Sequence, residues 1–257
     1  MSAPFLVHCH VPKTGGSALN RRFLYPSFGE GRVYQLYRYV FECASRLPPR
    51  HVSRAMRSYA ATGHVPVGFF DHVYPGAIYV SVFRDPVERT LSFLNFALSS
   101  ERHQVRKRLP DVVIRNASQD PDAYVNAVLD EPRLAVVQAN VQTRIAGGAA
   151  RLGDQPVNAL HLDQAFENLS RPTYLVGIQS ELETLVQRLG AVVPARARQG
   201  APDTASSPRL EKRLPRALSL DGLAPRTLER IRGANDLDLR LYDRVRESLA
   251  NPQRDAA

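Results

Sequence analysis

Val11-Pro12-Lys13-Thr14-Gly15-Gly16-Ser17-Ala18 is the stretch that decides the fold of this chain, because of the segments on either side of it. The apolar run at residues 5–10 precedes it and has the length and composition of a buried strand. Residues 17–24 follow and have the pattern of a helix that begins near Ser17. The sequence therefore predicts a strand, a glycine-containing loop and a helix N-terminus in direct succession.

Such a loop is typical of a site that binds a phosphate-like anion. Backbone N–H groups at a helix start point outward, and the helix dipole adds partial positive charge. Gly15 and Gly16 allow the backbone to approach an anion closely. Lys13 precedes these glycines, whereas nucleotide triphosphatases carry their lysine after them, in G-x-x-x-x-G-K-[ST]. No apolar strand ending in Asp accompanies the loop, so an ATPase is disfavoured.

Length and composition predict one globular domain, residues 1–257. Hydrophobic residues make up 44% and charged residues 23% of the chain, which is ordinary for a soluble protein. No stretch approaches the roughly 20 apolar residues of a membrane span, and the N-terminus lacks a signal-peptide pattern. We therefore expect a cytoplasmic protein. Cys9 and Cys43 form no CxxC pair, so neither a disulfide framework nor a structural zinc site is expected.

The net charge of +9 comes almost entirely from arginine, since Lys13, Lys107 and Lys212 are the only lysines. Basic proteins attract polyanions, including nucleic acids, anionic glycans and nucleotides. The basic residues are scattered except at residues 102–108, which we interpret as a solvated helix face rather than a binding patch. No nucleic-acid-binding motif accompanies them, so nucleic acid is not the expected partner. The sequence says nothing about the oligomeric state.

The order of predicted elements alternates between strands and helices, which favours an α/β fold with a mostly parallel sheet. Further strands are predicted at residues 33–36, 77–83 and 173–177. Helices are predicted at residues 51–61, from Pro86 through 94, at 180–189 and at 225–249. Residues 110–148 have an interrupted helical pattern, and residues 194–208 are predicted to form a mobile loop.

A second anion site is predicted where the strand at 77–83 ends. Arg84 lies at its carboxyl end, Pro86 suits the first position of a helix, and Ser92 lies on that helix. Ligands of open α/β sheets bind outside the carboxyl ends of the strands. A guanidinium offers bidentate donors to a phosphate, and a serine hydroxyl adds one more. A nucleotide with both 5′ and 3′ phosphates requires such a pair of sites.

With these two segments the chain resembles the PAPS-dependent sulfotransferases (PAPS, 3′-phosphoadenosine 5′-phosphosulfate). The likeness is to the carbohydrate-type branch, which includes heparan sulfate 2-O-sulfotransferase and bacterial relatives. Residues 13–17 resemble the family's 5′-phosphosulfate loop, and Arg84 with Ser92 its 3′-phosphate motif. Looser similarities occur at residues 63–66, 140–144 and 235–242. The resemblance implies a central parallel sheet of the P-loop-NTPase-like sulfotransferase type.

The resemblance also implies roles for single residues. The residues expected to hold the donor are Pro12, Lys13, Thr14, Gly15, Gly16, Ser17, Ala18, Arg84, Ser92 and Arg209, the last from a loop expected to close over the 3′-phosphate. Lys13 is expected to stabilise charge on the bridging oxygen while an acceptor hydroxyl, expected on a carbohydrate, attacks sulfur in line. No metal is expected, because a sulfuryl group carries less negative charge than a phosphoryl group.

His64 is the expected base, since it lies where the family carries a histidine and its pKa suits proton transfer. Thr62 stands where the heparan branch has a second histidine. His8 and His10 flank the first predicted strand, and His10 is expected to be packed or hydrogen-bonded. Gln142 and Arg144 are expected either to orient the acceptor or to form a helix-packing pair. Two other functions remain open: a nucleotide-dependent kinase, or a non-catalytic basic protein that binds a polyanion.

Overall fold

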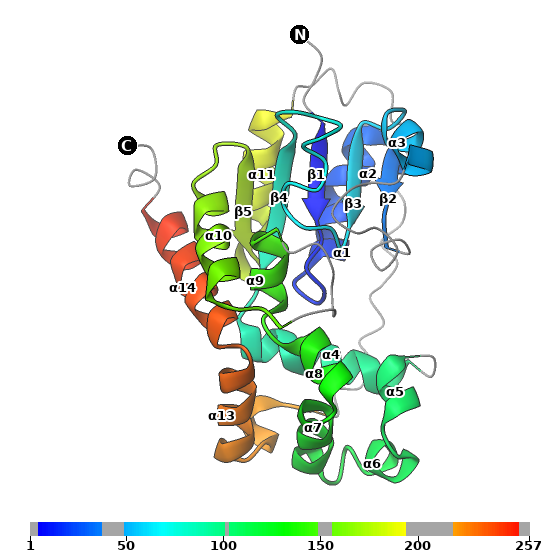
Figure 1. Cartoon of the computed structure of the whole chain (residues 1–257), viewed down its shortest axis with the longest axis vertical. Helices are drawn as coiled ribbons and strands as arrows, with labels where there is room; N and C mark the ends of the chain where they lie inside the picture. The colour runs from blue at the N-terminus through cyan, green and yellow to red at the C-terminus, as the bar shows by residue number, and fades with distance from the viewer. Residues whose placement is uncertain (1–4, 38–48, 101–102, 149–155, 194–217, 252–257) are drawn as a thin grey trace.

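Five parallel strands form the central sheet of the computed structural model, which describes residues 5–37, 49–100, 103–148, 156–193 and 218–251 (Figure 1). Their order across the sheet is β2-β3-β1-β4-β5. The strands are β1 (Leu6–Cys9), β2 (Val33–Gln35), β3 (Ala60–Gly63), β4 (Ile78–Phe83) and β5 (Tyr174–Ile178). The prediction of an α/β fold with a parallel sheet is confirmed. Because all strands run in one direction, their carboxyl ends lie at the same edge.

Four strands lie where the sequence predicted them, and β3 does not. A helix was predicted over residues 51–61, but α3 (Pro49–Ala55) ends at Ala55 and a strand begins at Ala60. That strand pairs with β1 on one side, Leu6 opposite Ala60, and with β2 on the other, Val33 opposite Ala60. The prediction was wrong because pairing on both sides, rather than local propensity, makes Ala60–Gly63 extended.

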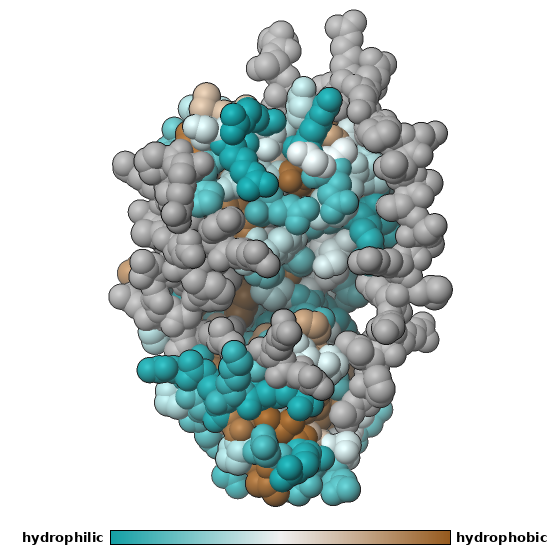
Figure 2. Space-filling model, turned by 90° about the vertical axis from the view of Figure 1, so that its right-hand side faces the viewer, coloured by the Kyte–Doolittle hydropathy of each residue, from teal (hydrophilic) through white to brown (hydrophobic). Residues whose placement is uncertain are grey.

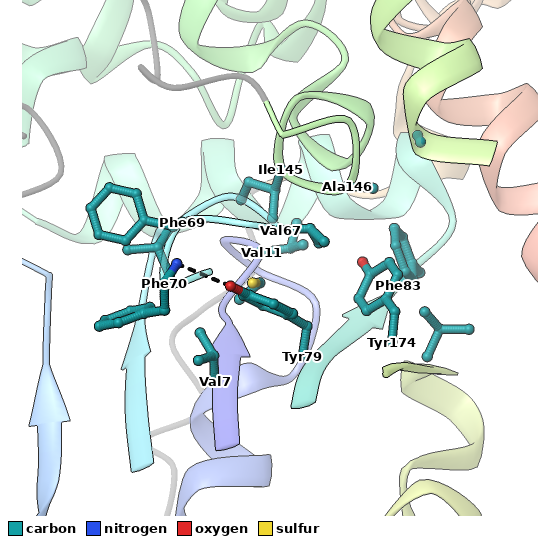
Figure 3. Packing of buried hydrophobic residues seen from close by; sticks show 14 of the residues in the cluster. Val7, Val11, Val67, Phe69, Phe70, Tyr79, Phe83, Ile145, Ala146 and Tyr174 are labelled. Atoms are coloured by element: carbon teal, nitrogen blue, oxygen red, sulfur yellow. Dashed lines mark hydrogen bonds between the residues drawn. The ribbon is translucent and has the colours of Figure 1, made fainter. Parts of the chain in front are cut away.

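Both faces of the sheet are covered by helices, as a parallel sheet requires. Side chains alternate along β1, so that Val7 and Cys9 enter one hydrophobic cluster and Leu6 another. The first face packs against α9 (Val141–Ala146), α10 (Ala159–Leu169) and α14 (Asp236–Ala250). Its core is shown in Figure 3, where the hydroxyl of Tyr79 accepts a hydrogen bond from the Phe70 amide at 3.0 Å.

The second face is covered by the helix that follows the glycine loop and by α11 (Leu182–Val192). The first of these helices begins as predicted next to Ser17, with α1 (Gly16–Leu19). It continues through a π-helical segment (Asn20–Leu24) into α2 (Tyr25–Phe28). One-turn 3₁₀ helices occur at Glu30–Arg32, Gln179–Glu181 and Leu220–Gly222.

A helical lobe lies beyond the carboxyl edge of the sheet, at the lower end of Figure 1. It contains α4 (Pro86–Ser99), α5 (Gln104–Arg108), α6 (Asp111–Arg115), α7 (Pro121–Asp130), α8 (Pro132–Gln138) and α13 (Pro225–Ala234). These helices share a hydrophobic cluster of their own, and apolar side chains also reach the lobe's surface in Figure 2. Within the described residues, no helix has the length and apolar character needed to cross a membrane.

The C-terminal helix predicted over residues 225–249 is two helices, α13 and α14, separated at Asn235. The side chain of Asn235 is fully buried. Its amide donates to the carbonyl of Ile231 at 2.9 Å, and its oxygen accepts from the Asn140 amide at 3.2 Å. A side chain that bonds to backbone in this way competes with helical hydrogen bonds and interrupts the helix. Apolar residues recur at helical spacing on both sides of Asn235, so the sequence pattern predicted one continuous helix.

Asn140 and Asp238 cap each other's helices. The Asn140 side-chain oxygen accepts from the amides of Leu237 and Asp238, at 3.1 and 3.0 Å, in the first turn of α14. In return the Asp238 carboxylate accepts from the amides of Gln142 and Thr143, at 3.1 and 2.7 Å, in the first turn of α9. These groups would otherwise be unpaired at two buried helix starts. Residues almost a hundred positions apart are joined in this way.

Replacing Asp238 with alanine should unfold the protein at markedly lower denaturant concentration. The change leaves two helix-start amides without acceptors, and it removes a negative charge that acts on the buried Arg89. We expect it to cost about 3 kcal/mol. Asp243, exposed on the same helix, provides the control, and Asp243→Ala should cost less than about 0.5 kcal/mol. Urea unfolding followed by circular dichroism measures both. Equal losses would contradict the reciprocal capping.

Candidate functional site

The candidate site lies at the carboxyl ends of β1 and β4. These strands are neighbours in the sheet, but the chain continues from them to strands on opposite sides. The chain leaves β1 toward β2, on one side of the sheet, and leaves β4 toward β5, on the other. Open α/β sheets bind ligands in the crevice that forms between two such strands. Lys13 follows β1 and Arg84 follows β4, so the structure brings the two predicted cations to adjacent strand ends.

The loop after β1 has an unusual backbone. Lys13 has a φ of 69°, and among the described residues only Asn140 shares a positive φ with it outside glycine. This conformation costs a lysine about 1 kcal/mol or more. The buried hydroxyl of Thr14 donates to the carbonyl of Val11 at 2.9 Å, which closes the loop on itself. The side chain of Thr14 is thus turned inward, while the bend presents Lys13 at the loop's tip.

The helix after this loop begins with no side-chain cap. Gly15, with a φ of 94°, precedes the first helical residue Gly16, and neither a Ser nor an Asp side chain takes up the first amides. The amide of Ala18 donates to the Gly15 carbonyl at 2.9 Å, so Ala18 is bound to the loop itself. Gly16 and the exposed Ser17 begin the helix, where amides have no intrahelical acceptor. These two amides are suited to an anion.

His64 directly follows β3, and it is bonded to His10, which directly follows β1. The His10 amide donates to the carbonyl of Gly63 at 2.8 Å, and the His64 Nδ1 lies 2.7 Å from the carbonyl oxygen of His10. A carbonyl only accepts, so Nδ1 carries the proton, and Nε2 of the neutral ring has a free lone pair. Burial lowers the pKa of His64, partly offset by the bond to the His10 carbonyl. His64 is therefore neutral at pH 7, as a base must be.

A buried polar network lies beneath the loop. Asn20, in the π-helical segment, accepts from His8 Nδ1 at 2.7 Å and from the Thr62 hydroxyl at 3.1 Å. Its amide donates to the Tyr37 hydroxyl at 2.9 Å, which in turn lies 2.7 Å from His10 Nδ1. Burial lowers the pKa of His8 to about 4 and that of His10 well below its usual value. Both histidines are packed and hydrogen-bonded, which was predicted for His10, and both remain uncharged at neutral pH.

Helix α4 faces the loop with one stripe of side chains. Glu88, Ser92 and Phe96 recur at every fourth residue, which places them on the same side of the helix. The Lys13 ammonium lies 4.4 Å from the centre of the Phe96 ring. The ring of Phe96 is 40% exposed, so α4 covers the loop with an accessible aromatic face. Ser92 lies one turn before Phe96 on the same side of α4, and Phe96 contacts Lys13.

Arg84 is the second cation of the site. Its guanidinium contacts the Glu88 carboxylate at 3.0 Å, one helical turn on, and the Arg84 side chain is 18% exposed. Such a pair contributes a few tenths of a kcal/mol, little enough for a phosphate to compete with. Gln142 and Arg144 are buried, at 0% and 3% exposure, and the amide of Gln142 bonds to the Arg84 backbone. The side chain of Gln142 is therefore bonded to the backbone of Arg84.

The sequence missed several residues that build the site, namely Asn20, Tyr37 and Phe96. The spacing of Phe96 from Ser92 by one helical turn was a usable signal, because both then share a helix face. Arg209 and the loop predicted over residues 194–208 lie outside the described residues. Pro12 lies in the loop but has no N–H to offer an anion. Within the described part of the chain, no three His, Cys, Asp or Glu side chains form a metal-binding group.

Comparison with known proteins gives no further guide to this site. Neither the models of protein families nor the sequences of curated proteins gave a match to this chain.

Alanine at position 16 should disrupt the loop. A Cβ built on Gly16 would lie 2.2 Å from Cδ2 and 2.5 Å from Nε2 of His10, whose ring is tied to Tyr37. The ring or the loop has to move, and we expect Gly16→Ala to cost about 1–3 kcal/mol. Gly233→Ala is the control, because no atom lies within 4 Å of that Cβ, and it should be neutral or stabilising. Urea unfolding measures both, and unchanged stability of Gly16→Ala would contradict this packing.

Proposed function

We propose that this protein is a sulfotransferase that moves the sulfuryl group of PAPS to a hydroxyl acceptor, expected on a carbohydrate. The observation that carries the proposal is that Lys13 and Arg84 follow the ends of two neighbouring parallel strands, β1 and β4. A donor with phosphates at both 5′ and 3′ positions fits two such cationic points. A nucleotide with phosphates at one end only would leave one of them unused.

The residues present fit this donor. The loop around Gly15 and Gly16 fits an anion because the first amides of the helix that follows it have no side-chain cap. Lys13 supplies a compact charge at the loop. Arg84 and the Ser92 stripe of α4 supply donors for the 3′-phosphate. PAPS provides an activated sulfuryl group, joined to its 5′-phosphate through a bridging oxygen.

In this reaction His64, Lys13 and Arg84 have different roles. Nε2 of His64 takes the proton of the acceptor hydroxyl as its oxygen bonds to sulfur. The Lys13 ammonium leaves the Phe96 ring for the bridging oxygen, where negative charge develops as the sulfur–oxygen bond breaks. Arg84 and the helix-start amides keep the departing bisphosphate in place. His8 and His10 stay neutral, so the positive charge of the site is concentrated at Lys13 and Arg84.

Removing either cation should weaken binding of adenosine 3′,5′-bisphosphate, the product nucleotide. We expect Arg84→Ala to raise its Kd about tenfold, and Lys13→Ala to lower the rate of sulfate transfer at least about a hundredfold. Lys107→Ala and Arg240→Ala are the controls, because both residues are exposed and lie on α5 and α14. Isothermal titration calorimetry measures the Kd, and labelled PAPS with a glycan panel measures transfer.

Wild-type protein that binds neither PAPS nor its product would overturn the proposal. Magnesium-dependent turnover of ATP would point to the kinase alternative. Salt-sensitive binding of glycan or nucleic acid without transfer would point to a polyanion-binding protein.

The pH dependence of transfer should report His64. Burial lowers the pKa of His64 below that of an ordinary histidine, so kcat/KM should fall only at a pH more acidic than the range in which a free histidine titrates. His64→Gln should lower kcat about a hundredfold or more and remove this acidic limb. The exposed His72 supplies the control variant His72→Gln, which should keep the wild-type profile. An unchanged rate and profile in His64→Gln would exclude His64 as the base.

A further inference from the structure

Gln142 brackets the backbone of Arg84. Its side-chain oxygen accepts from the Arg84 amide at 2.9 Å, and its side-chain nitrogen donates to the Arg84 carbonyl at 2.9 Å. Gln142 is completely buried. The pairing of β4 with β5 ends at Phe83 opposite Ile178, so no further strand pairing fixes Arg84. One carboxamide from α9 supplies both hydrogen bonds that a neighbouring strand would otherwise provide.

Gln142 is itself held in place by Asp238, a residue of α14. The Asp238 carboxylate accepts from two backbone amides, one of which is that of Gln142, and Asp238 lies in the first turn of α14, which Asn140 caps. The buried Arg89 lies near Asp238, and its positive charge counteracts the rise that burial gives the pKa of that carboxyl. Gln142 therefore has little freedom to shift along or around α9.

The consequence for Arg84 is that its backbone is fixed while its guanidinium remains partly accessible. The guanidinium has a single described anchor, the exposed carboxylate of Glu88. Where such a flexible side chain points depends on the position and direction of its Cα–Cβ bond, since its own rotamers are numerous. The bracket fixes the backbone from which that bond projects, directly after the end of β4. Without the two hydrogen bonds from Gln142, the backbone at Arg84 would be free to rotate, and the guanidinium would no longer be held toward the nucleotide.

We propose that Gln142 is a positioning residue that aims Arg84 at the 3′-phosphate of the nucleotide. This inference rests on the proposed function, because the phosphate it concerns is that of the PAPS donor. The role predicts a specific defect. Variants of Gln142 lose affinity for a nucleotide that carries a 3′-phosphate and keep affinity for one that lacks it, because the hydrogen bonds of the Gln142 side chain go to the backbone of Arg84.

Gln142→Met tests this, because methionine has a similar length and shape without hydrogen-bonding groups. Calorimetry with adenosine 3′,5′-bisphosphate should show a Kd about tenfold higher than wild type. With adenosine 5′-phosphosulfate, which has no 3′-phosphate, the Kd should change less than about twofold. In an Arg84→Ala background, Gln142→Met should add less than about twofold for either nucleotide, because the residue through which it acts is already gone.

Asn168→Leu is the control for a merely structural effect. Asn168 is also buried, and its amide donates to the carbonyl of Ala146 at 2.6 Å, at the opposite end of α9. This variant should lose stability and yet keep the wild-type ratio of the two affinities. If Gln142→Met does not fold, Gln142→Glu carries the test, because it keeps the acceptor for the Arg84 amide. It should then show a smaller loss, again confined to the 3′-phosphorylated nucleotide.

The outcomes separate the two proposals. If the wild-type protein does not bind the bisphosphate, the proposed function fails and the role of Gln142 fails with it. If the wild type binds it, and the Gln142 variants lose affinity for both nucleotides equally or for neither, the positioning role alone is overturned. Additive losses in the double variant with Arg84→Ala would also overturn it.

Discussion

The parallel direction of the five strands is the constraint on which the rest of the structure depends. It brings the residues that follow β1, β3 and β4 to one edge, although they are far apart in the chain. It also requires helices on both faces, because the sheet has no solvent-facing side. The helical lobe lies beyond the carboxyl edge of the sheet. From this lobe, the side chain of Phe96 on α4 contacts Lys13.

The charges of the site are arranged by burial as much as by sequence. Three histidines lie close to the loop, and ring centres of His10 are 5.1 Å from those of both His8 and His64. Ionisation of these rings would place several positive charges together in a dry environment, which desolvation and mutual repulsion oppose. Their pKa values are accordingly lowered. Neutral histidines supply hydrogen bonds, and Lys13 keeps the local positive charge for an anion.

A buried carboxylate connects this edge to the end of the chain. Asp238 caps α9 and, through Gln142, fixes the residue that follows β4. Burial raises its pKa, while Arg89 and the two helix amides oppose that rise. Replacing such a group by an apolar one costs more than the bonds themselves contribute, because the partners are left unpaired. The C-terminal helix is thus part of the support of the candidate site.

The sequence by itself determined the local events: where apolar runs make β1, β4 and β5, where Pro86 begins a helix, and where glycines open a loop beside Lys13. Each depends on neighbours within a few residues, so pattern and propensity suffice. Only the tertiary structure decided that Ala60–Gly63 is a strand, that Asn235 divides the last helix, and that Gln142 serves Arg84. The physical reason is the same in all three. In each case at least one hydrogen-bond partner lies tens of residues away, and only folding brings that partner within reach.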